Sequence, residues 1–211
     1  GGEWRDVTTR IVTPRPGQGH MKRPPGKVRI IGGRWRGTRL PVADSAGLRP
    51  TSDRARETLF NWLQPVLPGA RVLDLFAGSG ALGIEALSRG AAQALLVERD
   101  PALATALEDS LRRLDAGPAA RVVRADALAF LRLPVHGRFD VVFLDPPFDA
   151  GLWSPVLGVL DPWLAEGAWL YLESSAAAPV DPGSGWLPHR ELRTREAHHA
   201  LYRRPEAGSG R

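Results

Sequence analysis

The sequence predicts an α/β fold: a doubly wound, mostly parallel seven-stranded sheet of the Rossmann-like kind, preceded by a small hairpin and helix. Three observations lead to this prediction. Beyond Gly69, short apolar runs alternate with amphipathic helical patterns. A glycine-rich turn follows the first of these runs, and a pair of prolines follows the fourth. We therefore expect ligands at the carboxyl ends of the strands, where open α/β sheets bind them.

The individual elements follow from periodicity and punctuation. In front of the sheet we expect two short strands within residues 28–40 and a capped helix from Thr51 to Leu63. Strands of the sheet are expected at 71–76, 94–98, 121–125, 139–144 and 168–173, with a closing hairpin at 191–194 and 200–203. Helices are expected at 81–89, 101–114, 127–131 and 153–160. The predicted divisions are a disordered basic arm (1–26), a hairpin and helix extension (27–68), a main domain (69–204) and a flexible tail (205–211).

The composition is that of a globular protein with a basic amino-terminal region. The chain has 211 residues, 43% of them hydrophobic, and no cysteine, which excludes disulfides and thiolate chemistry. No run is long and apolar enough for a membrane span, and no signal-peptide layout is present, so a cytoplasmic protein is expected. Residues 1–56 hold thirteen Arg and Lys, well in excess of their Asp and Glu. This excess favours a polyanion such as nucleic acid as partner, although an arginine-rich composition from a GC-rich coding sequence would look the same.

The motif Asp145-Pro146-Pro147-Phe148 directly follows the apolar run 140–144. Two prolines in succession cannot continue a strand, because neither has an N–H group and each fixes its φ angle. The chain must therefore leave a buried strand at Asp145, at the edge where ligands bind. A carboxylate, stiff carbonyls and an adjacent ring suit a planar group that bears an NH₂, so the motif predicts an amine-methylation site.

A second motif, Asp74-Leu-Phe-Ala-Gly78-Ser-Gly80-Ala-Leu-Gly83, lies at the first strand-to-helix turn. Its glycines allow close backbone approach to a ligand and match the dinucleotide fingerprint, with Glu98 as the following acidic residue. A nicotinamide enzyme is therefore a rival interpretation. The carboxylate of Asp74 would repel a pyrophosphate but suits the ammonium group of S-adenosylmethionine. Asp126 is placed either to accept from an adenine amino group or to cap the next helix.

Four blocks of sequence resemble one family. They are Arg29-Ile-Ile-Gly-Gly-Arg-Trp-Arg-Gly, Leu48-Arg-Pro-Thr-Ser-Asp-Arg-Ala-Arg-Glu-Thr-Leu-Phe-Asn-Trp-Leu, Asp74-Leu-Phe-Ala-Gly-Ser-Gly-Ala-Leu-Gly-Ile-Glu-Ala-Leu-Ser-Arg-Gly and Asp145-Pro-Pro-Phe. With them the chain resembles the class I S-adenosylmethionine-dependent methyltransferases, and more closely the RsmD family, which methylates N2 of guanine 966 in 16S ribosomal RNA. The resemblance runs from about Val28 to about Arg203.

The resemblance and the residues together imply three sets of site residues. The target base is expected at Asp145, Pro146, Pro147 and Phe148. S-adenosylmethionine is expected at Asp74, Phe76, Ala77, Gly78, Gly80, Glu98, Arg99, Asp126, Ala127 and Asp145. Ribosomal RNA is expected at Arg34, Trp35, Arg36, Arg39, Arg49, Thr51, Arg54 and Arg56, within an assembling small subunit and with a monomeric enzyme.

The expected chemistry is attack of a guanine amine on a sulfonium methyl group. Asp145 and the Pro146 carbonyl are the candidate acceptors for the two N–H groups of the amine, and Phe148 would stack on a flipped or unpaired base. Glu173, at the end of the fifth strand, is a further candidate for the edge of the site. No metal is expected, since the histidines show no ligand spacing, and His198-His199 is expected as an exposed pair.

Other functions remain open on the sequence alone. A DNA adenine-N6 methyltransferase or a protein glutamine N-methyltransferase uses a comparable proline-proline turn. A NAD-dependent oxidoreductase would explain the glycine loop, and a non-catalytic RNA-binding assembly factor would explain the basic segment. The basic segment favours nucleic acid over a protein substrate, and an intact glycine loop beside Asp145 favours an active enzyme.

Overall fold

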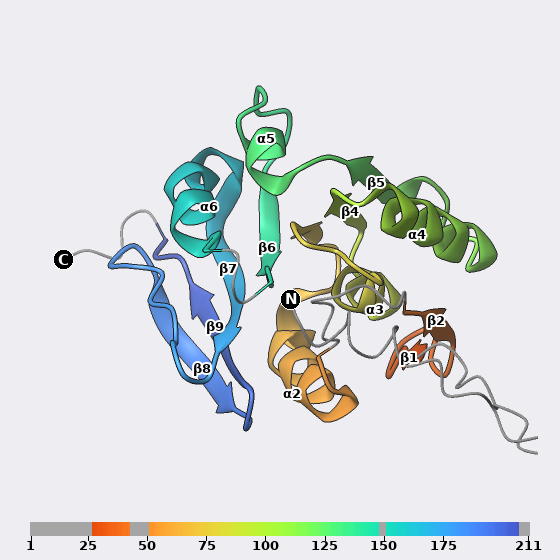
Figure 1. Ribbon diagram of the computed structural model, residues 1–211, viewed down its shortest axis with the longest axis horizontal. Helices are drawn as coiled ribbons and strands as arrows, with labels where there is room; N and C mark the ends of the chain where they lie inside the picture. Colours follow the sequence, from red (N-terminus) through yellow and green to blue (C-terminus); the bar gives the residue numbers. More distant parts are fainter. Residues whose placement is uncertain (1–26, 43–50, 148–150, 207–211) are drawn as a thin grey trace, which may run out of the picture.

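The computed structural model describes residues 27–42, 51–147 and 151–206. Within them, seven strands form one sheet in the order β5-β4-β3-β6-β7-β9-β8 (Figure 1). Five strands are parallel and β9 and β8 are antiparallel, which confirms the predicted doubly wound sheet with a closing hairpin. The strands are β3 (Arg71–Asp74), β4 (Gln93–Glu98), β5 (Ala120–Arg124), β6 (Phe139–Leu144), β7 (Leu164–Ser175), β8 (Leu187–Arg193) and β9 (Ala197–Arg203).

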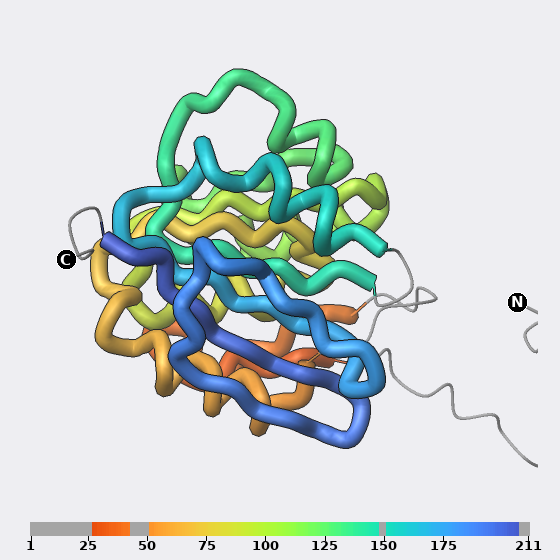
Figure 2. The backbone as a smooth tube through the Cα atoms, turned by 90° about the vertical axis from the view of Figure 1, so that its left-hand side faces the viewer, coloured from red at the N-terminus to blue at the C-terminus, as the bar shows by residue number. Residues whose placement is uncertain are grey.

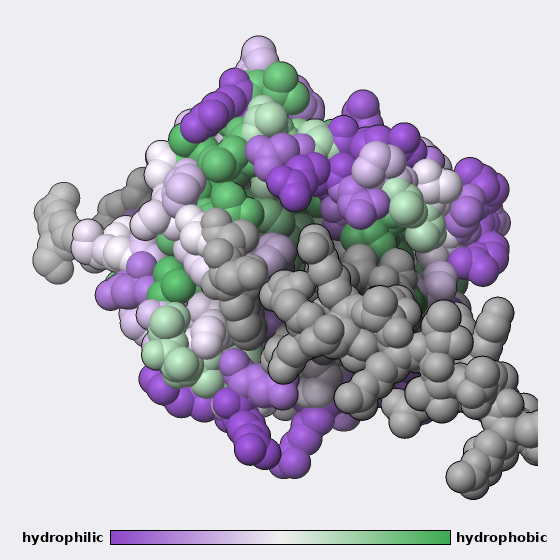
Figure 3. All heavy atoms as spheres, in the orientation of Figure 1, coloured by the Kyte–Doolittle hydropathy of each residue, from purple (hydrophilic) through white to green (hydrophobic). Residues whose placement is uncertain are grey.

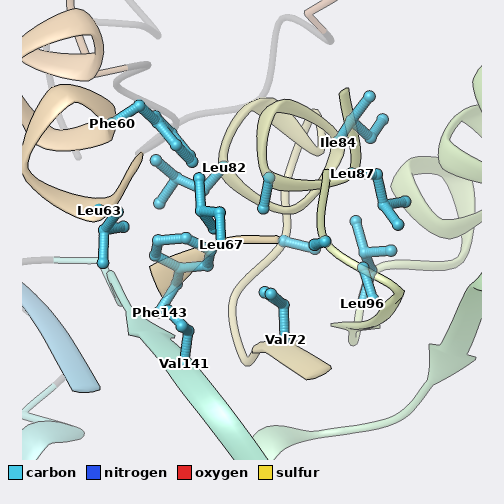
Figure 4. Packing of buried hydrophobic residues seen from close by; sticks show 14 of the residues in the cluster. Phe60, Leu63, Leu67, Val72, Leu82, Ile84, Leu87, Leu96, Val141 and Phe143 are labelled. Carbon is cyan, nitrogen blue, oxygen red and sulfur yellow. The ribbon is translucent and has the colours of Figure 1, made fainter. Parts of the chain in front are cut away.

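Helices cover both faces of the sheet. The helices are α2 (Asp53–Leu63), α3 (Ala81–Ser88), α4 (Pro101–Arg113), α5 (Ala127–Leu131) and α6 (Trp153–Leu160), with short 3₁₀ turns at Gln64–Val66, Gly117–Ala119 and Asp161–Trp163. Side chains of α2, α3 and α4 pack into one core cluster, and those of α5 and α6 pack into a second. In the first cluster, side chains of α2, α3, β3 and β6 converge around Phe143 (Figure 4). The ring of Phe143 lies 5.8 Å from that of Phe60 and 6.0 Å from that of Tyr171.

The extension in front of the sheet is a hairpin and a helix, as predicted. Strands β1 (Lys27–Arg29) and β2 (Arg39–Pro41) pair antiparallel. The turn between them docks on the end of α3, where the Arg34 N–H donates to the Ser88 carbonyl at 2.9 Å. Gly33 has a φ of +78°, and a Cβ there would lie 1.9 Å from that carbonyl oxygen. Only glycine fits this contact, so the Gly32-Gly33 pair in the sequence marks where the hairpin meets the main domain.

Two predictions about the carboxyl-terminal strands need correction. The fifth strand was expected at 168–173 but extends over Leu164–Ser175, because a register shift between Phe139 and Val141 lets pairing continue past Gly167. A glycine in a polar stretch reads as a strand end, whereas here it lies in an irregular part of the ladder. The prediction of His198 and His199 as an exposed pair is wrong, since each is only 5% exposed.

The outer strands of the sheet are β5 and β8. The β8–β9 hairpin forms one edge and lies in front in Figure 2, with the remaining strands stacked behind it. Hydrophilic side chains gather over the outer part of α4 and around the turn of the β8–β9 hairpin (Figure 3). Among the described residues, no helix is both long enough and apolar enough to span a membrane.

Candidate active site

Five carboxyl side chains form a row across the carboxyl ends of the parallel strands. Adjacent strands place them in the order Asp126, Glu98, Asp74, Asp145 and Glu173. The first four follow or end the parallel strands β5, β4, β3 and β6. Glu173 is level with Asp145, because the preceding residues Leu144 and Leu172 are register partners. Strand order reverses between β3 and β6, so Asp74 and Asp145 flank the switch point at which open α/β sheets bind ligands.

The glycine loop turns tightly between β3 and α3. Gly78 and Gly80 have φ angles of +55° and +84°, which other residues rarely adopt. Gly83 lies against β4, where a Cβ would be 2.9 Å from the Leu96 side chain. The glycines therefore serve the turn and the close packing of α3 on the sheet, as in nucleotide-binding folds generally.

Three N–H groups of the loop are already hydrogen-bonded within the chain. The Ala77 N–H donates to the Val97 carbonyl at 3.0 Å, and the Gly80 N–H donates to the Ala77 carbonyl at 2.8 Å. The Gly78 N–H donates to the Glu98 carboxylate at 3.1 Å. The carboxyl groups of Glu98 and Asp74 also lie at this loop, where they would meet the negative charge of a pyrophosphate, so the site disfavours the NAD-dependent alternative.

Asp74 is a buried carboxyl group beneath this loop. Its side chain is 1% exposed and accepts the Gly83 N–H at 3.0 Å. Burial is the main cause that raises its pKa from 3.8 to about 7, helped by the nearby Glu98 carboxylate and opposed by the Gly83 hydrogen bond. Two acidic groups at the loop favour a cationic ligand group over an anionic one.

Glu98 and Asp126 both engage backbone groups. The two carboxylate oxygens of Glu98 accept from Gly78 and from the Asp100 N–H at 2.9 Å, which fixes the carboxylate at the end of β4. Asp126 caps α5 by accepting the Ala129 N–H at 3.0 Å. The capping alternative is therefore observed, and one carboxylate oxygen takes part in it. Arg99 is exposed beside Glu98, and Ala127 is buried in the first turn of α5.

The Asp145 motif leaves the sheet as the two prolines require. Asp145 is half-buried, Pro146 is buried and Pro147 is exposed, while Phe148 lies outside the described residues. Burial raises the pKa of Asp145 well above its ordinary value, and the charge and hydrogen bonding of Glu173 and the charge of Asp74 raise it further. The group at the centre of the predicted site is thus a carboxyl that retains a proton more readily than a free aspartate.

Glu173 is held by three side chains from three parts of the chain. Its Oε1 accepts from the Thr51 hydroxyl at 2.8 Å and from the Tyr171 hydroxyl at 2.5 Å, and it lies 3.0 Å from the His199 Nδ1. The side chain of Glu173 is buried. Burial opposes its ionisation, but the hydrogen bonds from His199, Tyr171 and Thr51 outweigh that effect and hold its pKa below the ordinary value.

The predicted RNA contacts divide into exposed and buried residues. Arg34, Arg36, Arg39 and Arg54 are exposed, and Trp35 is partly buried, with the Arg34 guanidinium 4.1 Å from its ring centroid. The structure contradicts the prediction for Arg56, which is 0% exposed and forms ion pairs with Asp53 and Glu85. Thr51 is also buried and contacts Glu173, so its hydroxyl serves the interior. Arg49 lies outside the described residues.

Sequence reasoning missed three buried polar residues near these sites. The Glu85 carboxylate forms ion pairs with Arg56 and Arg89 and accepts the N–H groups of Ile31 and Gly32. It therefore joins the hairpin to α3. Tyr171 could have been found from its spacing of two from Glu173, which puts both on one face of a strand. His199 could not, because its place beside Glu173 depends on the antiparallel register of β7 and β9. The described residues hold no cluster of metal-ligating side chains.

Comparison with known proteins agrees with this arrangement. Residues 28–203 match the family described as conserved hypothetical protein 95. The chain is 48% identical to "Ribosomal RNA small subunit methyltransferase D" of Escherichia coli K12, over 89% of this chain and 98% of that protein. It is 43% identical to the protein of the same name from Haemophilus influenzae, over 84% and 94% of the two chains.

A solved structure of a similar chain has the same fold. The structure described as "Putative methyltransferase yhhF from Escherichia coli" superposes with a TM-score of 0.76 at 48% identity, and covers 86% of this chain and 99% of that one. The matches to these relatives thus cover most of the chain that carries the glycine loop and the Asp145 motif. The chain belongs to the conserved hypothetical protein 95 family, which is the RsmD family that its sequence motifs resemble.

Proposed function

We propose that this chain transfers a methyl group from S-adenosylmethionine to the exocyclic N2 of a guanine in 16S ribosomal RNA. The observation that carries the proposal is the position of Asp145 and Pro146 at the switch point, next to the glycine loop and Asp74. The relatives at 48% and 43% identity are named "Ribosomal RNA small subunit methyltransferase D". These names do not favour a DNA adenine or a protein glutamine substrate.

The glycine-loop edge fits S-adenosylmethionine. The cofactor supplies an electrophilic methyl group on a positively charged sulfur. Buried Asp74 and the fixed Glu98 carboxylate place carboxyl oxygens where its ammonium group and ribose hydroxyls would need acceptors. The proposed cofactor residues are Asp74, Phe76, Ala77, Gly78, Gly80, Glu98, Arg99, Asp126, Ala127 and Asp145.

The target-base residues act by accepting hydrogen bonds and by positioning. The lone pair of the guanine amine is delocalised into the ring, which makes N2 a weak nucleophile. An Asp145 carboxyl oxygen and the Pro146 carbonyl accept the two N–H groups of N2, which favours a pyramidal nitrogen with a localised lone pair. Positioning of this kind supplies several kcal/mol toward the reaction. The base must be unpaired or flipped to reach Asp145, with Phe148 as the proposed stacking partner.

Residues 27–68 form the proposed RNA-contacting extension. Arg34, Arg36 and Arg39 are exposed on the β1–β2 hairpin, and Arg54 is exposed on α2. Guanidinium groups suit phosphate oxygens, and the Arg34–Trp35 pair offers a flat surface for a base. We leave Arg56 out of this set, because its guanidinium is buried and paired with Asp53 and Glu85.

The proposed setting is an assembling small ribosomal subunit in the cytoplasm, with the enzyme as a monomer. One chain supplies both the cofactor edge and the target-base edge, so the reaction needs no second copy. A folded RNA also presents more phosphate to the hairpin than a free nucleotide does.

Transfer of labelled methyl groups tests the proposal. The substrates are small ribosomal subunits from cells that lack this activity, incubated with the wild type, with Asp145→Ala and with the exposed control Glu191→Gln. We expect incorporation mapped by mass spectrometry to N2 of a single guanine, loss in Asp145→Ala, and no change in the control. Absence of transfer to subunits, naked ribosomal RNA and DNA, despite tight cofactor binding, would overturn the proposal.

A further inference from the structure

Three titratable side chains lie side by side across three neighbouring strands. Phe143 and Tyr171 are register partners on parallel β6 and β7, so Asp145 and Glu173, each two residues further on, project from the same face. Glu173 and His199 are register partners on antiparallel β7 and β9. Glu173 therefore has the target-base carboxyl on one side and an imidazole on the other.

The donors of this cluster converge on one oxygen of Glu173. Thr51, Tyr171 and His199 all lie within hydrogen-bond distance of Oε1, and the Tyr171 hydroxyl lies 2.8 Å from the His199 Nδ1. An Nδ1–H of His199 can donate to the tyrosine hydroxyl while that hydroxyl donates to Glu173. Among the described residues, no donor of this cluster contacts Oε2, and Asp145 lies beside Glu173 at the end of the neighbouring strand, so we assign Oε2 to the carboxyl group of Asp145.

Two carboxyl groups in contact in a buried site hold one proton between them more readily than none. The donors around Glu173 favour its ionised form, so the negative charge stays on Glu173 and the shared proton on Asp145. Asp74, from β3, adds a third acidic group that faces Asp145 and disfavours a further charge there. The neighbouring charges given as causes of the raised pKa of Asp145 are both acidic, so they reinforce this preference.

We propose that Glu173 is a positioning residue for the methyl transfer: it binds the proton of Asp145 on the side away from the base, so that the carbonyl oxygen of Asp145 is the one presented to the guanine amine. This inference rests on the proposed function and extends it to residues outside the Asp145 motif. Without Glu173, Asp145 is itself the charged group, and once it is protonated at lower pH its O–H is free to turn toward the amine, where a donor would meet a donor.

The same pair also accounts for the proton that the reaction releases. The C–S bond to the methyl group breaks as the C–N2 bond forms, and its electron pair stays on sulfur. The methylated N2 then carries one proton too many, and the carbonyl oxygen of Asp145 accepts it as the N2–H bond breaks. The proton already shared with Glu173 moves onto Glu173. The pair thus takes up one proton and becomes neutral, and water removes that proton after release of the base.

The pH dependence of kcat separates this role from a structural one. The variants are Glu173→Gln, Tyr171→Phe and the control Glu191→Gln, whose exposed carboxylate pairs with His198 on the same hairpin at 2.8 Å. We expect wild type and control to keep their kcat between about pH 5 and 8, because the pair loses its charge only when Glu173 is protonated. In Glu173→Gln the remaining charge belongs to half-buried Asp145, so kcat is lost at a higher pH than in the wild type and is about tenfold or more below it at the acid end of this range.

Tyr171→Phe is the milder variant, since it keeps the ring and removes one donor to Glu173. We expect the acid limb of its profile to move in the same direction by a smaller amount. An unchanged profile in both variants, with kcat lowered evenly at all pH values, would overturn the proposal.

An infrared measurement on the free enzyme needs no activity. Buried Asp74 also holds a proton in part at neutral pH, so the bands are read as differences from the wild-type spectrum. The proposal predicts that the protonated-carboxyl band of Asp145 is lost from the Asp145→Asn and Glu173→Gln spectra and kept in that of Glu191→Gln. Presence of that band in Glu173→Gln at the same pH would contradict the assignment. Failure of the wild type to methylate ribosomal RNA would instead count against the proposed function, since the infrared result does not depend on a substrate.

Discussion

The two halves of the carboxyl row are held by different means. On the β5-β4-β3 half, Asp126, Glu98 and Asp74 accept hydrogen bonds from backbone N–H groups within a few residues of a strand end or helix start. On the β6-β7-β9 half, Glu173 is held by the side chains of Thr51, Tyr171 and His199, the first of them 122 residues away.

This difference has a consequence for how each half tolerates change. Backbone donors are present whatever the neighbouring side chains are, so the cofactor half depends on the turn and on its glycines. Side-chain donors can each be removed by one substitution, so the target-base half depends on several separate positions. The first half suits a cofactor that many proteins bind, and the second half fixes the carboxyl group of Glu173.

We expect the largest effect on stability from Arg56, a buried cation that supports the half held by side chains. Arg56 joins α2, whose start carries Thr51, to Glu85 on α3. Arg56→Ala leaves Glu85 with one fewer buried partner, and we expect a loss of about 3–5 kcal/mol in the free energy of unfolding. Arg54→Ala, exposed two residues earlier, should change it by no more than about 0.5 kcal/mol. Urea unfolding measures both, and equal losses would show that burial of Arg56 is not what matters.

The buried carboxyl of the backbone-held half predicts a pH dependence of stability. The pKa of Asp74 is raised from 3.8 to about 7, so its contribution to stability is fully present below the pKa of the unfolded chain and is lost as pH rises through about 7. Relative to Asp74→Asn, the wild type should lose up to about 1.4 kcal/mol per pH unit between about pH 4 and 7. Parallel stability curves for the two proteins over that range would contradict the raised pKa.

A smaller effect should separate binding from chemistry on the cofactor side. Glu98→Gln replaces a carboxylate oxygen by an NH₂ group that meets the N–H of Gly78 or Asp100. We expect cofactor affinity to fall about tenfold, with kcat at saturating cofactor nearly unchanged. Isothermal titration with S-adenosylmethionine measures the affinity, with exposed Glu108→Gln as the matched control. A fall in kcat without a change in cofactor affinity would show that Glu98 does not serve the cofactor half.

The smallest single effects are expected on the hairpin. Arg34→Ala and Arg36→Ala should each weaken RNA binding and reduce the slope of log affinity against log salt by about 1. Arg112→Ala is the control, since that arginine is exposed on α4 and pairs with Asp109. Filter binding with small subunits over a series of salt concentrations gives the slopes. Equal slopes for the wild type and all three variants would remove the hairpin from the proposed RNA surface.

The same contrast explains what the sequence could predict. Strand and helix order, the glycine loop and the Asp145 turn depend on local chemistry, and the structure confirms the doubly wound sheet. The roles of Arg56, Tyr171 and His199 depend on which strands and helices become neighbours, which periodicity does not contain. Arg54 and Arg56 look alike in sequence, and only the packing of α2 on α3 decides that one is exposed and the other buried.

Single-turnover methyl transfer by Asp145→Ala at saturating cofactor tests the central claim most directly. The claim is that the Asp145 half performs the positioning of the amine while the glycine-loop half holds the cofactor. We predict a transfer rate to small subunits reduced about a hundredfold or more, with cofactor affinity within severalfold of the wild type. A rate close to that of the wild type, or a defect confined to cofactor affinity, would contradict the claim.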